Sequence, residues 1–333
     1  MMAQPEDRTP GAEPDGRFDR TRLKEQLSGA GPLVGLALLV VVLSILSPAF
    51  LSVNNVVNIF QQISVLAILA LGATAVIITG GIDLSVGSVL ALAGISTAWL
   101  ANEAGLPFLV AVVLGLLVGG VAGFVNGILI TKGKLPPFIA TLAMLSMARG
   151  LTLVISDGRP ISGFPDGFRL LVNYRLFGIV PLSVLLVLAL YVAGSAYLRL
   201  RPSGRALYAI GGSHEVARLS GLRVEREKIK TYTAAGFLAG AGGLLLAARL
   251  NSAQPNAGGG IELDVIAAVV IGGASLAGGA GTVAGTLTGA LIIGVLRNGL
   301  NLLDVSSFWQ QVVIGAVIAA AVMADTLRRR ADD

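Results

Sequence analysis

Long apolar intervals without charged residues dominate the chain. Residues 26–82 contain no Asp, Glu, Lys or Arg, and neither do residues 265–296. A helix needs roughly 20 apolar residues to cross a hydrocarbon core of roughly 30 Å, so each interval has room for two crossings. Single crossings fit 84–102, 104–131, 135–156, 176–198, 231–248 and 305–324. The pattern predicts an all-α, polytopic membrane bundle of about ten transmembrane helices.

One long polar insert interrupts this pattern between Arg199 and Lys230. It holds eight of the 24 basic residues and the only histidine. We expect this insert to be a docking surface outside the membrane. The predicted organisation is a disordered tail over 1–29 that is rich in Pro, Gly, Asp and Arg, a transmembrane domain over 30–327 that includes the 199–230 insert, and a short tail over 328–333.

The positive charges predict which side of the membrane each connection faces. Lys and Arg are retained on the cytoplasmic side during insertion. With ten crossings, one side receives 18 of the 24 basic residues, namely those of 1–30, Lys132, Lys134, the 199–230 insert and Arg328 to Arg330. Both termini are therefore expected in the cytoplasm, with the chain in a cell (inner) membrane. The turns at 80–87 and 278–282 carry no Lys or Arg and are either ordinary loops or re-entrant segments.

Composition narrows the classes of function. Apolar residues make up 54% of the chain and charged residues 13%, which is typical of an integral membrane protein in a lipid bilayer. The net charge of +5 is explained by the cytoplasmic segments, so no nucleic acid is expected as a partner. Without cysteine there are no thiolate sites, and the lone His214 cannot form a histidine metal cluster. We expect no catalytic residue, no metal and no cofactor.

Two glycine-rich interruptions share the spacing G-G-x-x-L-x-x-G. The first is G-G-I-D-L-S-V-G at 80–87, and the second is G-G-A-S-L-A-G-G at 272–279. The repeated spacing arises either by chance in a glycine-rich chain or because the two segments are the broken helices of an internal repeat. Asp83 in the first interruption either caps the following helix and forms the turn, or lines a polar pathway together with Ser85.

Glycines spaced by four residues recur along the chain and predict close helix packing. They occur at Gly115–Gly119, Gly119–Gly123, Gly123–Gly127, Gly236–Gly240, Gly281–Gly285 and Gly285–Gly289.

A few polar side chains fall at membrane depth and are candidates for a translocation pathway. They are Asn58, Gln61, Gln62, Asn126 and Asn298, in addition to Asp83 and Ser85. Asn58 and Gln62 are four residues apart and share one helix face. These amides either satisfy one another in the bundle or form transient hydrogen bonds with a polar solute.

The segment from Ser252 to Gly258 is expected on the outer side. It leads into Glu262 and Asp264, whose carboxylates favour the positive end of a helix dipole. Helix initiation is one interpretation of these acids. The other is an outer rim, formed by Gln254, Asn256, Glu262 and Asp264, that contacts a delivered solute or protein.

Several long motifs closely resemble the membrane permease subunit of ribose-type ABC sugar importers. They include G-G-I-D-L-S-V-G-S at 80–88, N-G-I-L-I-T-K-G-K-L-P-P-F-I-A-T-L-A at 126–143, G-R-A-L-Y-A-I-G-G at 204–212, A-R-L-S-G-L at 217–222, the run from Ala248 through Q-P-N-A-G-G-G-I-E-L-D to Thr286, and N-G-L-N-L-L-D-V-S-S-F-W-Q at 298–310. The resemblance covers about 30–325. It implies ten helices, a separate ABC ATPase subunit, a periplasmic or lipoprotein sugar-binding protein, and a second permease that is either another copy or a related chain. Ribose or a similar monosaccharide is the implied cargo.

The same resemblance implies that the 199–230 insert couples the permease to the ATPase through short helices. Apolar anchors at Ala206, Leu207, Tyr208 and Ile210 would enter a groove of the ATPase, and Arg205, Glu215 and Arg218 would fix the orientation. Gly211 and Gly212 would end the first helix and Ser213 would cap the next. The predicted coupling residues are Gly204, Arg205, Ala206, Leu207, Tyr208, Ala209, Ile210, Gly211, Gly212, Ser213, His214, Glu215, Ala217 and Arg218. The alternative is a solvated basic loop.

The chain carries no nucleotide-binding motif of its own. The segment from Gly127 to Leu135 has five residues between its first glycine and the Gly-Lys pair, and Leu135 stands where a hydroxyl is needed. ATP is therefore expected on the partner subunit. The alternatives are a branched-chain amino acid permease of the same superfamily, an ion-coupled secondary carrier, and a membrane enzyme, for which no cluster of acid, base or metal ligands is visible.

Overall fold

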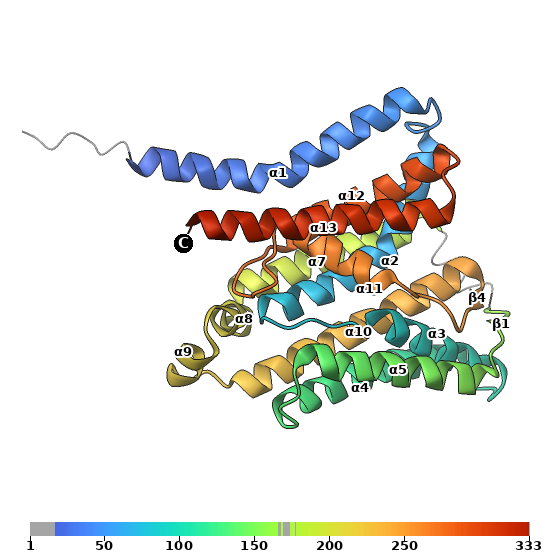
Figure 1. Cartoon of the computed structure of the whole chain (residues 1–333). Coiled ribbons are helices and arrows are strands. Elements are labelled where there is room, and N and C mark those ends of the chain that lie inside the picture. The colour runs from blue at the N-terminus through green and yellow to red at the C-terminus, as the bar shows by residue number, and fades with distance from the viewer. Residues whose placement is uncertain (1–16, 166–167, 169–173, 177, 333) are drawn as a thin grey trace, which may run out of the picture.

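The chain folds into a bundle of helices that run along one common direction (Figure 1). The computed structural model describes residues 17–332 except 166, 167, 169–173 and 177. In these residues the helices are α1 (Arg17–Leu46), α2 (Val53–Ile78), α3 (Val86–Asn102), α4 (Phe108–Thr131), α5 (Pro137–Ser156), α7 (Leu182–Leu200), α8 (Pro202–Gly212), α9 (His214–Leu219), α10 (Val224–Leu250), α11 (Ile261–Ile271), α12 (Val283–Leu302) and α13 (Ser307–Asp332). The strands are β1 (Ile161–Ser162), β2 (Arg175–Leu176), β3 (Val180–Pro181) and β4 (Ser252–Ala253).

The predicted all-α class is confirmed. Apolar intervals become helices because every backbone polar group in hydrocarbon must be satisfied within its own segment. In the described part of the chain, six helices are long and apolar enough to cross a membrane, namely α2, α4, α5, α7, α10 and α12. Shorter apolar stretches lie in α1, α3 and α13. Each interval where a single crossing was expected overlaps one of these helices.

The interval 265–296 differs from the expectation of two full crossings. It holds most of α12 and only part of α11, which has 11 residues. At a rise of about 1.5 Å per residue, α11 is roughly 16 Å long, or half the hydrocarbon core. The half-helix ends because Gly272 and Gly273 follow it, and Gly273 has a φ of +88° that other residues rarely adopt.

Helix also extends into both predicted tails. α1 begins at Arg17, inside the segment expected to be disordered, and α13 continues to Asp332. Residues 17–28 contain neither Gly nor Pro and are rich in Arg, Lys, Glu, Gln and Leu, which are good helix formers. Residues 1–16 of the N-terminal tail lie outside the described residues.

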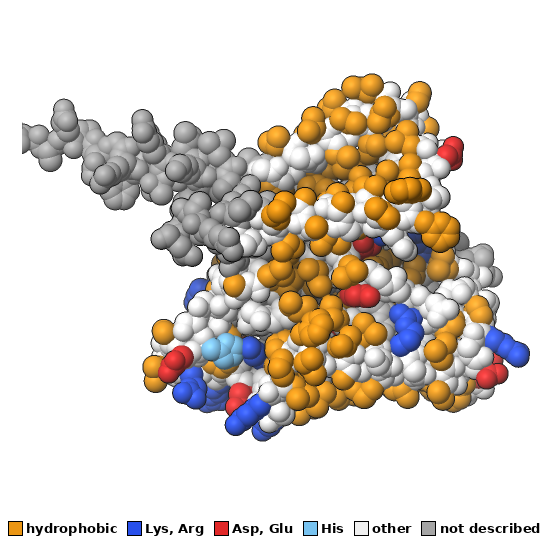
Figure 2. All heavy atoms as spheres, in the orientation of Figure 1, with side chains coloured by type: hydrophobic (Ala, Val, Ile, Leu, Met, Phe, Trp, Pro, Cys, Tyr) orange, Lys and Arg blue, Asp and Glu red, His pale blue; other side chains and the backbone are white. Residues whose placement is uncertain are grey.

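Different elements lie at the two ends of the bundle. The start of α1, the end of α13, α8 and α9 gather at one end, which we call the α8–α9 end (Figure 1). At the opposite end β1 pairs with β4, and Asn102 Nδ2 donates a hydrogen bond of 2.8 Å to the Ser162 carbonyl oxygen. Charged side chains gather at these ends, while apolar side chains cover much of the surface between them (Figure 2). This distribution is that of a membrane-embedded bundle.

Helix α2 forms the centre of the bundle. Of its most apolar window, 83% is buried, against 22% for α7, most of whose apolar surface is not covered by this chain. α2 contacts α7, α10, α11 and α12. A helix that is apolar on all sides is stable here because other helices surround it.

The glycine spacings mark the closest helix contacts, as expected. Gly119 and Gly123 of α4 face Gly236 of α10, where an added Cβ would touch backbone atoms of the opposite helix. On α12, Gly289 lies against the Ala268 carbonyl of α11 in the same manner. Without side chains at these positions the backbones approach closely and gain van der Waals contact, which drives helix association in lipid.

Candidate functional site

The α8–α9 segment forms two short helices joined at a defined corner. Gly212 ends α8, and the Ser213 hydroxyl accepts a hydrogen bond of 3.3 Å from the Val216 N–H at the start of α9. Both features confirm the sequence-based prediction. The corner turns α9 away from the bundle while α8 stays in contact with α2, α7 and α10.

Helix α8 turns its apolar face inward. The exposed fractions of Ala206, Leu207 and Ile210 are only 7%, 1% and 1%, and Gly204 is buried against the end of α7. This corrects the expectation that these side chains enter a groove of a partner, because they already pack in this chain's own core. The sequence alone did not reveal the direction, since apolar residues occupy successive positions of α8.

Two apolar side chains that the sequence analysis did not single out point into solvent from α9. Val216 is 61% exposed and Leu219 is 79% exposed. Among the predicted coupling residues, those exposed around them are Arg205, Ala209, Gly212, Ser213, His214, Glu215 and Arg218, while Ala217 is buried. We call Val216, Leu219 and these exposed neighbours the α9 surface. Exposed apolar residues rimmed by charges are typical of protein interaction sites.

The electrostatic surroundings of α9 keep its histidine neutral. Partial burial and then the nearby Lys228 ammonium lower the pKa of His214, and a hydrogen bond with the Ile210 backbone opposes them. Both of the larger effects disfavour the imidazolium form. The α9 surface therefore presents an uncharged imidazole near neutral pH.

Helix α8 also packs against the place where the two glycine-rich interruptions, 80–87 and 272–279, meet. The Gly279 N–H donates a hydrogen bond of 2.9 Å to the Ile78 carbonyl oxygen, which joins the end of α2 to the loop between α11 and α12. An added Cβ at Gly211 would touch both groups of this hydrogen bond. Tyr208 adds a second contact, because its hydroxyl donates a hydrogen bond of 2.9 Å to the Gly281 carbonyl oxygen. Helix α8 therefore contacts both interrupted segments directly.

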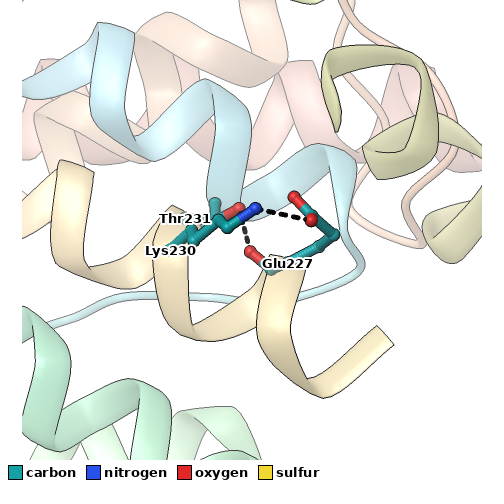
Figure 3. A network of polar contacts seen from close by, with 3 residues as sticks. All are labelled: Glu227, Lys230 and Thr231. Carbon is teal, nitrogen blue, oxygen red and sulfur yellow. Dashed lines mark hydrogen bonds and ion pairs between the residues drawn. The ribbon is translucent and has the colours of Figure 1, made fainter. Parts of the chain in front are cut away.

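The first turns of α10 brace the segment that follows α9. Lys230 Nζ and Glu227 Oε1 form an ion pair at 2.8 Å, and the Thr231 hydroxyl donates to the Glu227 carbonyl oxygen at 2.8 Å (Figure 3). The Glu227 side chain is only 12% exposed, so the paired ammonium compensates for its partial desolvation. These contacts hold the beginning of α10 helical as it leaves the polar end of the bundle.

The first interruption is a turn held by its own side chains. Asp83 Oδ1 accepts hydrogen bonds from the Ser85 N–H at 2.8 Å and from the Ser85 hydroxyl at 2.6 Å. Asn126 Nδ2 of α4 donates to the Ser85 hydroxyl at 3.0 Å. Asp83 thus forms the turn, and it does so three residues before α3 begins at Val86 rather than by capping the helix. These three predicted pathway residues are buried together.

A cavity of about 790 Å³ opens between α2, α10, α11, α12 and α13. Its volume lies within the range of roughly 300–1,000 Å³ that is usual for small-molecule sites. Apolar side chains and the glycines of 258–260 form much of the wall. The polar side chains of the wall are Gln62, Arg249, Asp264, Arg297, Asn301 and Gln311.

One ion pair crosses this wall from α11 to α12. Arg297 Nη2 lies 2.6 Å from Asp264 Oδ2, and Asp264 is nearly buried while the Arg297 side chain is 44% exposed. Sequence reasoning placed Asp264 on an outer rim and did not assign Arg297. The pairing was not visible because 33 residues separate the two positions.

The remaining predicted pathway residues lie in different surroundings. Gln62 lines the cavity, Asn58 is exposed and Gln61 is half-buried. Asn298 forms a reciprocal amide pair with Asn55, with donor-to-acceptor distances of 2.9 and 3.0 Å. Asn55 was missed by the sequence analysis, although its position three residues before Asn58 gave a periodic signal.

The residues of the predicted outer rim lie partly on the loop before α11 and partly in α11 itself. Asn256 is exposed, and Gln254 Nε2 donates a hydrogen bond of 3.2 Å to the Ser252 hydroxyl. Glu262 is half-buried in the first turn of α11, as helix initiation requires. Arg149 of α5 fixes this loop, because its Nη1 donates to the Pro255 carbonyl oxygen at 2.6 Å and to the Ala257 carbonyl oxygen at 3.0 Å.

Comparison with protein families identifies the class of the chain. A family model described as "Branched-chain amino acid transport system / permease component" matches residues 55–322. The chain belongs to this permease family. The match extends from the start of α2 into α13 and therefore includes the interruptions, the α8–α9 segment and the cavity of the permease.

Three relatives illustrate what this permease is similar to. "Ribose import permease protein RbsC" of Bacillus subtilis (strain 168) is 49% identical over 297 residues, which cover 89% of this chain and 92% of the relative. The protein of the same name from Escherichia coli (strain K12) is 46% identical over 320 residues, covering 94% and 97%. "D-allose transport system permease protein AlsC" of Escherichia coli (strain K12) is 41% identical over 296 residues, covering 88% and 90%. A search of the solved structures found no match.

Proposed function

We propose that this permease is the membrane subunit of an ABC importer that carries ribose or a similar monosaccharide. A soluble binding protein on the outer side would deliver the sugar, and a separate ATPase subunit would supply the energy. The high identity to permeases named for ribose and allose, over about nine tenths of the chain, carries this proposal. The cavity between α2, α10, α11, α12 and α13 supports it, because a sugar-sized solute fits its volume and six polar side chains lie on its wall.

The subunit arrangement is part of the same proposal. Two copies of the permease would form the pathway, with the α8–α9 end and both termini in the cytoplasm of a cell whose inner membrane holds the complex. The basic residues support this orientation, since eight of the 24 lie between Arg199 and Lys230.

The α9 surface is the proposed contact with the ATPase. Val216 and Leu219 would enter an apolar groove while Arg205, Glu215 and Arg218 fix the orientation, as in other helix-in-groove interfaces. The apolar residues of α8 would serve a different purpose, namely transmission of the movement. Gly211 and Tyr208 touch the hydrogen-bonded junction of the two interruptions, so a displacement of α8 changes the packing of α2, α11 and α12 together.

Reconstitution of the permease with its ATPase and binding protein in proteoliposomes tests the proposal. We expect uptake of ribose that requires ATP. Leucine uptake in place of ribose would favour a branched-chain amino acid permease. Uptake that persists without ATP but collapses with an ion gradient would identify a secondary carrier.

Coupling is tested in the same proteoliposomes with two changes. Val216→Ser combined with Leu219→Ser should lower both ATPase binding and ribose uptake, whereas Leu135→Ser, at an exposed apolar residue of the α4–α5 loop, should change neither. Gly211→Leu should preserve ATPase binding but reduce the ribose imported per ATP, because the new side chain strikes backbone at Ile78. Normal transport by both variants would refute the coupling assignment.

A further inference from the structure

We infer that Asp264 and Arg297 are the groups that contact the transported solute, and that the solute they fit is a neutral polyhydroxylated molecule. Both side chains line the 790 Å³ cavity and meet as an ion pair on its wall, one from α11 and the other from α12. The inference rests on the proposed function, because it assigns the substrate contact within the same pathway.

The pair keeps hydrogen-bonding capacity that its own contact does not use. Only Asp264 Oδ2 and Arg297 Nη2 meet, at 2.6 Å. Within the described residues, no other hydrogen bond involves either side chain, which leaves the second carboxylate oxygen and most of the five guanidinium N–H groups for a ligand. A carboxylate beside a guanidinium thus offers an acceptor and donors at adjacent points of the cavity wall.

This combination matches a pair of neighbouring hydroxyl groups. Each hydroxyl is both a donor and an acceptor, so one can donate to Asp264 while the next accepts from Arg297. The amides Gln62, Asn301 and Gln311 on the same wall also carry one acceptor and two donors each. The ion pair carries no net charge. It therefore binds a neutral solute through hydrogen bonds and does not retain it by charge. Arg249 is the group that would favour an anion instead.

The position of the pair also connects the solute contact to the coupling helix. Asp264 lies before the 272–282 loop and Arg297 lies after it. That loop carries Gly279 and Gly281, which contact α8 through Gly211 and Tyr208. A displacement of α8 therefore moves the two helices that hold the pair. The solute contact then changes when the ATPase subunit moves α8.

A cysteine-protection experiment on the full complex tests the contact without altering the pair. The chain has no cysteine, so Gly315→Cys provides a single thiol on the cavity wall, at a position with no heavy atom within 4 Å of an added Cβ. D-ribose should slow its labelling by a membrane-impermeant maleimide, and 2-deoxy-D-ribose should protect less because it lacks one neighbouring hydroxyl. Ser306→Cys, exposed at the start of α13 and outside the cavity, should be labelled at the same rate with or without sugar.

Removing both charges tests the role of the pair. In the Gly315→Cys chain, Asp264→Asn with Arg297→Gln should raise the ribose concentration needed for protection about tenfold, because neutral hydrogen bonds replace charge-assisted ones. The ribose imported per ATP should fall by a similar factor, while stimulation of the ATPase by the loaded binding protein stays unchanged. A purely structural pair predicts unchanged protection, since no unpaired charge remains.

The outcomes separate the two proposals. Import of ribose by the wild-type complex with no protection at Gly315→Cys, or with full protection after neutralisation of the pair, overturns this inference and leaves the proposed function standing. Stronger protection by D-ribonate than by D-ribose also overturns it, because Arg249 then selects an anion. Failure of the wild-type complex to import any monosaccharide overturns the proposed function itself.

Discussion

At the scale of single residues, buried amides in this bundle are satisfied by partners far away in the sequence. Asn55 and Asn298 exchange two hydrogen bonds across a separation of 243 residues. A reciprocal amide pair leaves few unsatisfied groups in an apolar environment, where each would be costly. The pair therefore fixes the position of α12 against α2 near the start of α2.

Asn298→Leu should lower the free energy of unfolding by about 1 kcal/mol, because it leaves the buried Asn55 amide without its partner. The added change Asn55→Leu should restore part of the loss, since no unpaired amide remains. Asn58→Leu is the matched control on the same helix and should have little effect, because Asn58 is exposed. Titration with denaturing detergent compares the wild type, the single variants Asn298→Leu, Asn55→Leu and Asn58→Leu, and the double variant. Strictly additive effects would show that the two amides do not cooperate.

The single histidine allows its surroundings to be measured directly. Because burial and Lys228 lower the pKa of His214, the unfolded chain binds this proton more readily than the folded chain. The contribution of His214 to stability is therefore present above about pH 6.5 and is lost as the pH falls. An NMR titration of histidine-labelled protein should give one signal with a pKa below 6.5.

Lys228→Met should raise the pKa of His214, and Lys132→Met, the same charge change in the α4–α5 loop, should not. An unchanged pKa in Lys228→Met would mean that burial alone accounts for the shift.

At the scale of helices, glycine contacts set how closely α4 and α10 approach. Gly236 faces the backbone of Gly119 and Gly123, so Gly236→Ala should destabilise the protein by about 1–3 kcal/mol through overpacking. Gly150→Ala on α5 is the matched control, because no heavy atom lies within 4 Å of its added Cβ. Higher helix propensity should make the control neutral or up to about 1 kcal/mol more stable. Detergent unfolding compares the two, and equal effects would refute close packing as the cause.

The positions of most helices could be predicted from the sequence, and for a physical reason. Lipid permits few structures other than helices, so intervals without charge map onto α1 to α5, α7, α10, α12 and α13. The length of α11 could not be predicted from apolar character, because Gly272 and Gly273 break a helix without adding any charge to the interval. The inward face of α8 was also hidden, since the apolar run at 206–210 obscures the stripe formed by Ala206, Leu207 and Ile210.

The candidate site was predictable only in part. Asp264 and Gln62 were identified as polar residues in or near the membrane, and both line the cavity. Arg297 was missed because its function depends on a partner on another helix, and sequence spacing does not reveal which helices touch. Val216 and Leu219 were missed because sequence spacing does not reveal tertiary arrangement either. Their exposure follows from the turn at Ser213 rather than from their own side-chain chemistry.

At the scale of the whole molecule, the α8–α9 segment, the start of α1 and the end of α13 lie together at one end of the bundle (Figure 1). The connection after α4 belongs to the same end, because Gly127 of α4 packs against Ile229 near the start of α10. The connection after α3 lies at the opposite end, where Asn102 contacts β1. Lys132 and the α9 surface should thus share one side of the membrane, and Ala104 should face the other.

Single cysteines in this cysteine-free chain test the orientation in intact cells. A membrane-impermeant maleimide should label Ala104→Cys and Ser306→Cys, while Lys132→Cys and Ser213→Cys should react only after the cells are opened, because basic segments stay in the cytoplasm. The reverse pattern would invert the orientation and place the α9 surface outside, where no ATPase could reach it. Labelling that separates Lys132→Cys from Ser213→Cys would contradict the antiparallel packing of α4 on α10, and with it the path from α8 to the cavity.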